Sequence, residues 1–318
     1  MTTKEQLITL YKERLNNTNE PDKNLSDSSI VAYIGNILKL AKDMGVTLEP
    51  ASFINFKQVI KFIEEHNENL NTRKNKANSV VMYLKANNNV EVLKQYGEFI
   101  MSMRDKIDEA MSKNEKSPKE EKNWLDKDEL AAIASKLKDT LPTTKVNPPP
   151  YEKLLAYQQY FILQFHIQNP LRNDLATTLI GSGVYKGAEN YIRIRPNIKS
   201  AEMMLREYKT EKTYGLINFK ITGVALTALL EYYKILKKYT NITKGPQPLI
   251  ITKDKKQISR NNYTKHFQEI FKDTGKSVST TLIRKSVVSS NTDPTKIKEL
   301  ARVMGHSVDI HLGTYSKK

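Results

Sequence analysis

The sequence Leu300-Ala301-Arg302-Val303-Met304-Gly305-His306-Ser307 is followed by residues 308–313, then by Thr314-Tyr315 and three further residues. His306 and Tyr315 are nine positions apart, and on one straight helix this spacing puts two side chains on opposite faces. They can meet only if the chain turns between them. Gly305 is placed to end a helix, and Gly313 allows a bend just before Tyr315. The stretch therefore predicts two short elements that present His306 and Tyr315 toward one point.

Taken alone, these two residues also have an ordinary interpretation, as a histidine with a satisfied hydrogen bond and a packed tyrosine. Basic residues earlier in the sequence favour a functional interpretation over this ordinary one. Arg172 follows Asn169-Pro170 in the predicted first turn of a helix, where a cation opposes the helix dipole unless an anion also lies there. Asp174 either orients the Arg172 guanidinium toward such an anion or simply pairs with it.

Two further basic residues lie in distinctive positions. Lys209 is near the tip of a predicted hairpin, where a long ammonium side chain reaches a ligand, although a solvated turn lysine is the commoner case. Arg284 lies inside a largely apolar helix that Ser279-Thr280 cap, with Thr281 one turn back on the same side. A buried Arg is costly without a partner. Either a phosphate, which suits its planar fork, or an internal carboxylate fits this position.

The 318 residues favour two domains, and their net charge of +16 is unevenly spread. Residues 1–120 hold 18 basic and 17 acidic side chains, so 121–318 hold 33 (51 less 18) and 18 (35 less 17). This imbalance favours a polyanion partner for the second half, most often nucleic acid. Codon bias of an AT-rich genome explains the choice of Lys over Arg, but it does not explain why the excess lies in one half.

Several classes of site and location are disfavoured. The chain has no Cys, and only Asp309 lies between His306 and His311, so we expect no disulfide, no metal site and no metal cofactor. There is no long apolar run and no signal-peptide pattern. We therefore expect a soluble, intracellular protein that has no membrane partner and is not secreted.

The N-terminal part, residues 1–111, reads as a helical bundle with periodic apolar residues. We expect helices over residues 1–16, 30–44, 56–66, about 74–84 and 91–111. Arg73, Lys74 and Lys76 form its one dense basic cluster, at the predicted start of the fourth helix. A contact to the DNA backbone and a merely solvated face are equally compatible with this cluster.

A stretch without any apolar residue, 112–122, predicts a flexible linker. Asp126 and Glu129 directly after it have the spacing of a capping box, with Leu125 and Leu130 at the positions of a hydrophobic staple. A second domain, 123–318, therefore begins here. We expect helices at 127–137, 151–168, 224–239 and 262–272, and strands at 191–195, 203–208, 214–221 and 249–251, the second and third forming a hairpin. The fold class is mainly α with a small antiparallel β-sheet.

Taken together, five residues resemble the active site of the tyrosine recombinase (phage-type integrase) family. The matching segments are Asn-Pro-Leu-Arg172-Asn-Asp, Tyr-Lys209-Thr-Glu-Lys, Thr281-Leu-Ile-Arg284-Lys-Ser, and Met-Gly-His306-Ser with Tyr315 nine residues on. The match covers essentially all of 123–318, and the N-terminal bundle looks like the family's core-binding domain. Each motif alone is weak, whereas the ordered set is specific.

The resemblance implies a site-specific DNA recombinase that needs no cofactor. Tyr315 would be the nucleophile that attaches to a DNA 3′ phosphate, with Arg172 and Arg284 neutralising developing charge, Lys209 as general acid, and His306 as hydrogen-bond donor or base. Double-stranded DNA with specific sites and a homo-tetramer are the implied partners, and the expected DNA contacts are Arg73, Lys74, Lys76, Lys212 and Lys285. The composition suits an integrase of a virus, virophage or mobile element.

The sequence departs from the family pattern at two places. Thr281 stands where the family usually has His, and only three residues follow Tyr315, so a subunit exchange through a C-terminal segment must use another element or be weak. Two other functions stay open. One is a type IB topoisomerase, which shares the chemistry, and the other is a non-catalytic DNA-binding protein derived from a recombinase.

Overall fold

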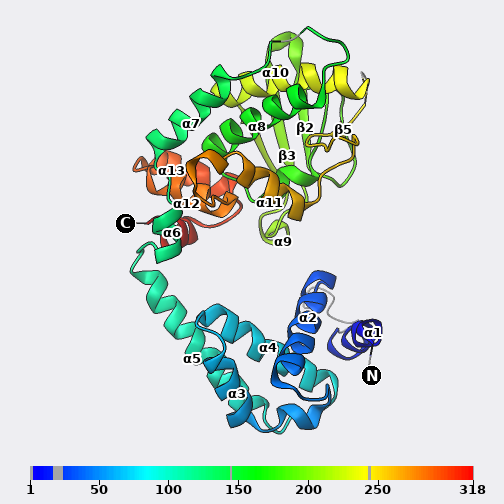
Figure 1. Ribbon diagram of the computed structural model, residues 1–318, viewed down its shortest axis with the longest axis vertical. Coiled ribbons are helices and arrows are strands. Elements are labelled where there is room, and N and C mark those ends of the chain that lie inside the picture. Colours follow the sequence, from blue (N-terminus) through cyan, green and yellow to red (C-terminus); the bar gives the residue numbers. More distant parts are fainter. Residues whose placement is uncertain (1–2, 17–23, 144, 243–244, 318) are drawn as a thin grey trace. The chain divides into compact units, whose positions relative to one another are not determined.

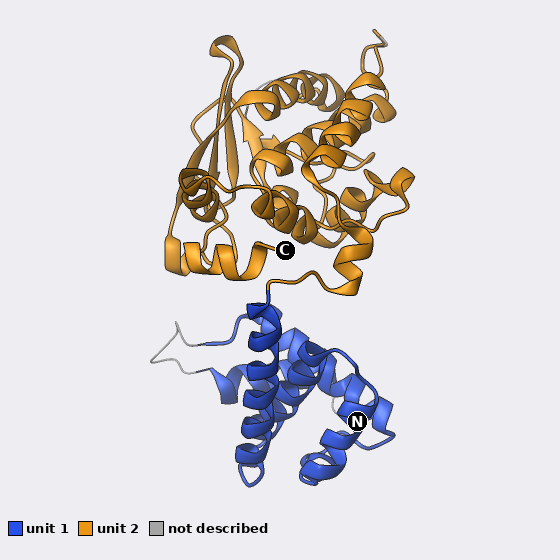
Figure 2. Cartoon of the chain, turned by 90° about the vertical axis from the view of Figure 1, so that its left-hand side faces the viewer, with its two compact units in different colours: residues 1–113 blue, residues 114–318 orange. Residues whose placement is uncertain are grey.

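The computed structural model describes residues 3–16, 24–143, 145–242 and 245–317 (Figure 1). The chain divides after Lys113 into two compact units, which Figure 2 shows in different colours. None of the helices in the described ranges is both long and apolar enough to cross a membrane.

Unit 1 is all-helical, as predicted for this part of the chain. Its elements are α1 (Lys4–Leu15), α2 (Asp27–Met44), a 3-10 turn (Pro50–Phe53), α3 (Phe56–Glu65), α4 (Leu70–Ala86) and α5 (Leu93–Ser112). Polar N-caps begin α2, α3 and α4, and Gly45 ends α2 in the left-handed conformation. The apolar side chains along one face of α2 are buried, and α2 packs against α4. The spacing of these apolar residues therefore decides which face of the helix turns toward the core.

Unit 2 has helices α6 (Pro118–Asn123), α7 (Lys127–Asp139), α8 (Tyr151–Gln168), α9 (Glu211–Tyr214), α10 (Gly223–Thr240), α11 (Arg260–Glu269), α12 (Thr280–Ser289), α13 (Pro294–Val303) and α14 (Val308–Ile310). Its strands are β1 (Leu179–Gly181), β2 (Tyr191–Arg195), β3 (Ser200–Leu205), β4 (Ile217–Ile221) and β5 (Gln247–Pro248). Short 3-10 turns lie at Asn173–Thr177, Pro196–Ile198 and Lys272–Thr274, and a π-helical turn spans His311–Tyr315.

The five strands form one sheet in the order β4-β3-β2-β1-β5. The mainly α fold class with a small sheet and the predicted hairpin are confirmed, because β3 and β4 pair antiparallel with Met203 opposite Phe219. The sheet is mixed rather than antiparallel throughout. The unpredicted strand β1 pairs parallel with β2, and at three residues it is too short to show an alternating pattern.

Helix α8 forms the centre of the core of unit 2 (Figure 1). Its Phe161 ring stacks on Tyr232 of α10 at 5.6 Å, and its Phe165 ring lies 6.5 Å from Phe219 of β4. An apolar sequence over nearly the whole circumference of α8 predicted this burial. The capping box of α7 is also confirmed, because the Asp126 carboxylate accepts from Glu129 N at 2.8 Å, and Asp126 N donates to Glu129 Oε2 at 2.9 Å.

Three predicted boundaries are corrected. Residues 112–122, predicted to lack regular structure, are partly helical, because Ser112 ends α5 and Ser117 caps α6, whose Glu120 pairs with Lys285 of α12. The strand expected at 249–251 lies at β5 instead, and Leu249 N donates to Thr178 O beyond its end. In the hairpin, residues 206–216 form a long connection that contains α9.

Candidate active site

The C-terminal turn brings His306 and Tyr315 together. Gly305 ends α13 with φ +64°, and His306 N donates to Ala301 O across this end. Ser307 then caps α14, and the π-helical turn returns the chain so that the Tyr315 ring stacks on the His306 ring, with centroids 5.1 Å apart and 11° between planes. The bend expected at Gly313 is therefore part of this π-helical turn, a rare geometry often found at functional sites.

Arg284 lies against the same tyrosine. Its guanidinium carbon is 4.4 Å from the centre of the Tyr315 ring, and its Nε donates to Pro170 O at 3.0 Å. The side chain is only 2 % exposed, so most of its charge is out of water. The prediction of a buried Arg inside α12 is therefore confirmed, and the packed neighbours of its guanidinium are a ring and a carbonyl.

Buried polar atoms without a hydrogen-bond partner gather in this cluster. In the part of the chain that the structure describes, they include Arg284 Nη2, His306 Nδ1 and His311 Nε2. A buried donor or acceptor without a hydrogen bond costs roughly 1–3 kcal/mol of stability, so native proteins rarely retain several such atoms at one place without a functional reason. These atoms without partners belong to one guanidinium and two imidazoles. Such groups can donate hydrogen bonds, so together they suit the binding of an anion.

Arg172 is half-buried and precedes a turn rather than lying in the first turn of a helix, so that prediction is wrong. The backbone of Arg172 is extended. Helix α8 ends at Gln168, since Pro170 keeps Asn169 out of the helical region. Asn173 holds the segment in place, accepting from Thr280 Oγ1 at 2.7 Å and donating to Thr264 Oγ1 at 2.8 Å.

Asp174 forms its ion pair with Arg260, at 3.6 Å, rather than serving only as the partner of Arg172. Burial raises the pKa of the Asp174 carboxyl, and the positive charges of Arg260, Arg172 and Arg284 oppose this rise. Arg172 and Arg284 thus share one electrostatic environment, in which the Asp174 carboxylate faces three cations. An additional anion is favoured there.

Burial also sets the charge states of the cluster. It lowers the pKa of His306 to about 3, helped by Arg284, His311 and Arg172, so this imidazole is neutral at pH 7. Burial lowers the pKa of Arg284 to about 10, an effect that Arg172 increases and Tyr315 opposes, so the guanidinium keeps its charge. The site therefore combines a neutral base or hydrogen-bond donor with a fixed cation.

Lys209 is exposed in the connection between β3 and β4, next to the C-terminal turn. Its neighbour Thr210 donates from Oγ1 to Gly305 O at 2.6 Å. A Cβ added to Gly305 would lie 2.7 Å from the ring of Tyr208, so only glycine permits this approach. The residues on both sides of Lys209 thus pack on the turn that carries His306, and the Lys209 side chain itself is exposed.

Thr281 is exposed on α12, one turn before the buried Arg284. The neighbouring Thr280, which bonds to Asn173, is the threonine that faces the interior. Thr281 therefore lies at the surface of the site and not within its buried part.

The five predicted DNA contacts have different surroundings. Arg73 donates from Nε to Asn67 O at 2.6 Å and from Nη2 to Glu64 O at 3.0 Å, and buried Lys76 lies 3.8 Å from Asp43. Lys285 pairs with Glu120. These three are held by protein groups, because each lies beside acceptors of its own unit. Lys74 is half-buried on α4 and Lys212 is exposed on α9.

His311 is the site residue that the sequence interpretation missed. Its Nδ1 lies 3.1 Å from His306 Nε2, and its ring is fully buried. The sequence offers one signal, a second histidine five residues after the first, but this spacing indicates only a candidate zinc ligand. Among the described residues no group of three or more potential metal ligands is close enough to hold an ion.

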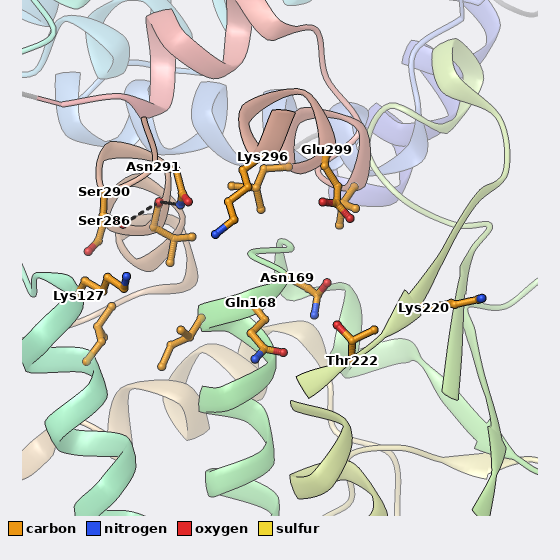
Figure 3. Close-up of a pocket in the computed structure, with 15 residues that line it drawn as sticks. Lys127, Gln168, Asn169, Lys220, Thr222, Ser286, Ser290, Asn291, Lys296 and Glu299 are labelled. Atoms are coloured by element: carbon orange, nitrogen blue, oxygen red, sulfur yellow. Dashed lines mark hydrogen bonds between the residues drawn. The ribbon is translucent and has the colours of Figure 1, made fainter. Parts of the chain in front are cut away.

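Two cavities of unit 2 are lined by residues of α13. One of about 440 Å³ is lined by His306 and Ser307 together with residues of α9, β4 and α13. The other, of about 430 Å³, lies among α7, α8, α12 and α13, and Figure 3 shows Lys127, Lys296 and Lys220 around it with Gln168 and Asn169. The second cavity is lined by none of the five residues predicted to be catalytic, and Thr281, also counted as a catalytic position, does not line it either.

Comparisons with known proteins give a distant likeness in structure and none in sequence. No protein-family model matches the chain, and no curated protein matches it. Among solved structures, the chain is similar to one described as "Crystal structure of XerA recombinase", with 11 % sequence identity and a TM-score of 0.43, over 99 % of this chain and 94 % of that one.

Proposed function

We propose that this chain is a tyrosine-type site-specific DNA recombinase that cleaves and rejoins DNA through a phosphotyrosine. The observation that carries the proposal is the packing of buried Arg284 against Tyr315, with its Nη2 and the neighbouring His306 Nδ1 left without partners. A tyrosine held between a guanidinium and an imidazole is arranged for attack on a phosphodiester, because both groups can bond the charged phosphoryl oxygens.

In the proposed cleavage step, Tyr315 Oη forms a bond to phosphorus while the bond from phosphorus to the 5′ oxygen breaks. The phenol proton passes to a base, for which neutral His306 is the candidate, and the leaving 5′ oxygen takes a proton from Lys209. Arg172 and Arg284 neutralise the charge that develops on the non-bridging oxygens. Attack by a 5′ hydroxyl on the phosphotyrosine reverses these transfers and rejoins the strand.

The partner in this proposal is double-stranded DNA with specific sites. Residues 121–318 carry a net charge of +15, from 33 basic less 18 acidic residues, so several phosphates can be neutralised and binding should weaken steeply with salt. Unit 1 would contact the same DNA, with Lys74 in its basic cluster. Strand exchange needs cleavage of two duplexes, for which a homo-tetramer is the proposed assembly, and a viral or mobile-element genome is the proposed cargo.

A nicked suicide duplex tests the proposal, because the short strand downstream of the cleaved phosphate diffuses away and the adduct accumulates. A library of such duplexes with randomised sequence should give a protein–DNA adduct from a restricted set of sites. Supercoiled plasmid without a selected site should not be relaxed efficiently. Rapid relaxation of any plasmid would instead indicate the type IB topoisomerase, and sequence-selective binding without any adduct would indicate a non-catalytic DNA-binding protein.

A further inference from the structure

His306 and His311 form a pair of buried histidines beside Tyr315. His306 Nε2 and His311 Nδ1 are 3.1 Å apart, and the two rings are tilted by 45° with centroids 5.3 Å apart. His306 is 5 % exposed and His311 fully buried. Because water does not reach this contact, one of the two nitrogens must carry the proton of a real N–H···N hydrogen bond.

We propose that His311 is a positioning residue that fixes the tautomer and the ring orientation of His306 for the reaction of Tyr315, an inference that rests on the proposed function. The ring of His306 contacts two partners at once, Tyr315 by stacking and His311 by the hydrogen bond. Without the second contact, rotation about the Cβ–Cγ bond of His306 is opposed only by packing.

The pair can exist in two neutral arrangements. When His306 Nε2–H donates to His311 Nδ1, His306 Nδ1 is a bare acceptor. When His311 Nδ1–H donates to His306 Nε2, His306 Nδ1 carries a proton and is a donor. In both arrangements the outer nitrogens, His306 Nδ1 and His311 Nε2, are the buried atoms that lack partners.

The first arrangement suits a base. If His306 Nδ1 takes the Tyr315 proton, His306 becomes a cation, and its remaining Nε2–H bond to His311 becomes charge-assisted and stronger. This is how a third residue supports a base that activates a nucleophile. The second arrangement suits a hydrogen bond from Nδ1 to a phosphoryl oxygen. His311 therefore lets one imidazole serve either role without leaving its ring position.

The charged groups around His306 and His311 favour the neutral form of both imidazoles in the protein without DNA. Burial and Arg284 lower the pKa of His311, as they do for His306. The groups that face the pair are Arg284 on α12, Arg172 before the 3-10 turn, and Tyr315. A phosphate between the two arginines would screen their charges and make a proton on the pair less costly, at the moment when the proton must be accepted.

Two substitutions separate positioning from packing. His311→Asn places an amide atom near the position of Nδ1 and keeps the bond to His306, whereas His311→Leu fills similar space without a polar atom. His266→Asn, which changes a partly buried histidine of α11 bonded to Gln158, is the matched control. All measurements use the full chain and the duplex that gives the best adduct yield with the wild-type protein.

Adduct formation under single-turnover conditions and DNA affinity are measured for each protein. We expect His311→Leu to slow adduct formation by at least about tenfold with unchanged DNA affinity, and His311→Asn and His266→Asn to stay within about threefold of wild type. A folded His311→Leu protein with the wild-type rate would overturn the proposal. So would equal losses of rate, affinity and thermal stability in both His311 variants, because packing alone would then explain them.

Imidazole nitrogen NMR of the free protein tests the pair without any reaction. We expect one slowly exchanging N–H proton shared between His306 and His311, which disappears in His311→Leu. Absence of this proton in the wild-type protein overturns the inference even if DNA is cleaved. Conversely, an intact shared proton in a wild-type protein that forms no adduct with any duplex would contradict the proposed function and not the pair.

Discussion

Arg73 in unit 1 and Arg284 in unit 2 are both helical arginines that the sequence marks as phosphate contacts, but their surroundings differ. Arg73 donates from Nε and Nη2 to two backbone carbonyls. Arg284 makes one such bond, stacks on Tyr315, and keeps Nη2 buried without a partner. Position and charge therefore do not separate the two arginines, whereas their hydrogen bonds do, and on this basis we propose that Arg73 is structural and Arg284 functional.

The largest expected effect is on Arg284. Arg284→Lys keeps a positive charge but loses the planar fork, so we expect adduct formation to fall by about 10²–10³-fold, because a transition-state contact is removed. DNA affinity should fall only modestly, since the ground state uses this contact less. Single-turnover kinetics and equilibrium binding measure the two effects. Equal losses of rate and affinity would make Arg284 a DNA-positioning contact and weaken the contrast with Arg73.

The buried histidines predict a difference in acid stability between the units. Burial lowers the pKa of His166 to about 3, below the unfolded value near 6.5, so this group stabilises the fold fully above pH 6.5 and loses that contribution as pH falls toward 3. Between pH 7 and 5 the loss from His166 is about 2 kcal/mol. Hydrogen exchange of the backbone amides of α8 at pH 7 and pH 5 should measure this loss of unfolding free energy.

Unit 1 serves as the internal reference, because its one histidine, His66, is exposed. His166→Phe should make the loss of stability of unit 2 between pH 7 and 5 smaller by about 2 kcal/mol, while leaving α4 in unit 1 unchanged. If unit 2 keeps its full stability at pH 5, the buried histidines are not held neutral, and the neutral-base role of His306 loses its support.

A smaller effect is expected for Arg73. Arg73→Gln removes two hydrogen bonds from a charged donor, so we expect unit 1 to lose about 1.5 kcal/mol of unfolding free energy. The rate of adduct formation at saturating DNA should not change. Denaturant unfolding measures the loss, and Lys74→Gln, one position along the helix, is the control. Unchanged stability together with a large loss of DNA affinity would reverse our assignment and make Arg73 a phosphate contact.

The smallest effect is expected at Thr281. Because its side chain is exposed, Thr281→His should change the unfolding free energy by less than about 0.5 kcal/mol. It should also retain adduct formation or raise it, as an imidazole at the surface of the site can add a hydrogen bond to DNA. A folded but inactive Thr281→His protein would mean that the surface of the site is built around the smaller residue.

The elements that were predicted correctly are those with a local signal. The apolar circumference of α8, the capping box at Asp126 and the glycine at 305 each report a short-range constraint, and all three hold in the structure. The parallel strand β1 could not be predicted, because its partner β2 lies ten residues on and its own length is three. Parallel pairing of so short a strand is decided by tertiary contacts.

In the candidate site, too, features with a local sequence signal could be predicted, and features that depend on tertiary contacts could not. The convergence of His306 and Tyr315 follows from their spacing and the turn between them, and a glycine marks that turn. The hydrogen bonds of Arg73 and the ion pair of Lys76 could not be predicted, because a basic cluster gives no indication of which backbone carbonyls or carboxylates its side chains reach. His311 was visible only as a residue type. Its contact with His306 depends on the π-helical turn, and the sequence patterns used above do not predict such a turn.

The most direct test of the central claim is to identify the amino acid that is joined to DNA. The wild-type adduct on a nicked suicide duplex is digested with protease, and the DNA-linked peptide is sequenced by mass spectrometry. We predict a peptide that contains Tyr315, linked to a 3′ phosphate, and no adduct from Tyr315→Phe although it still binds the duplex. An adduct at another residue, or one that persists at wild-type yield in Tyr315→Phe, would contradict the assignment of Tyr315 as the nucleophile.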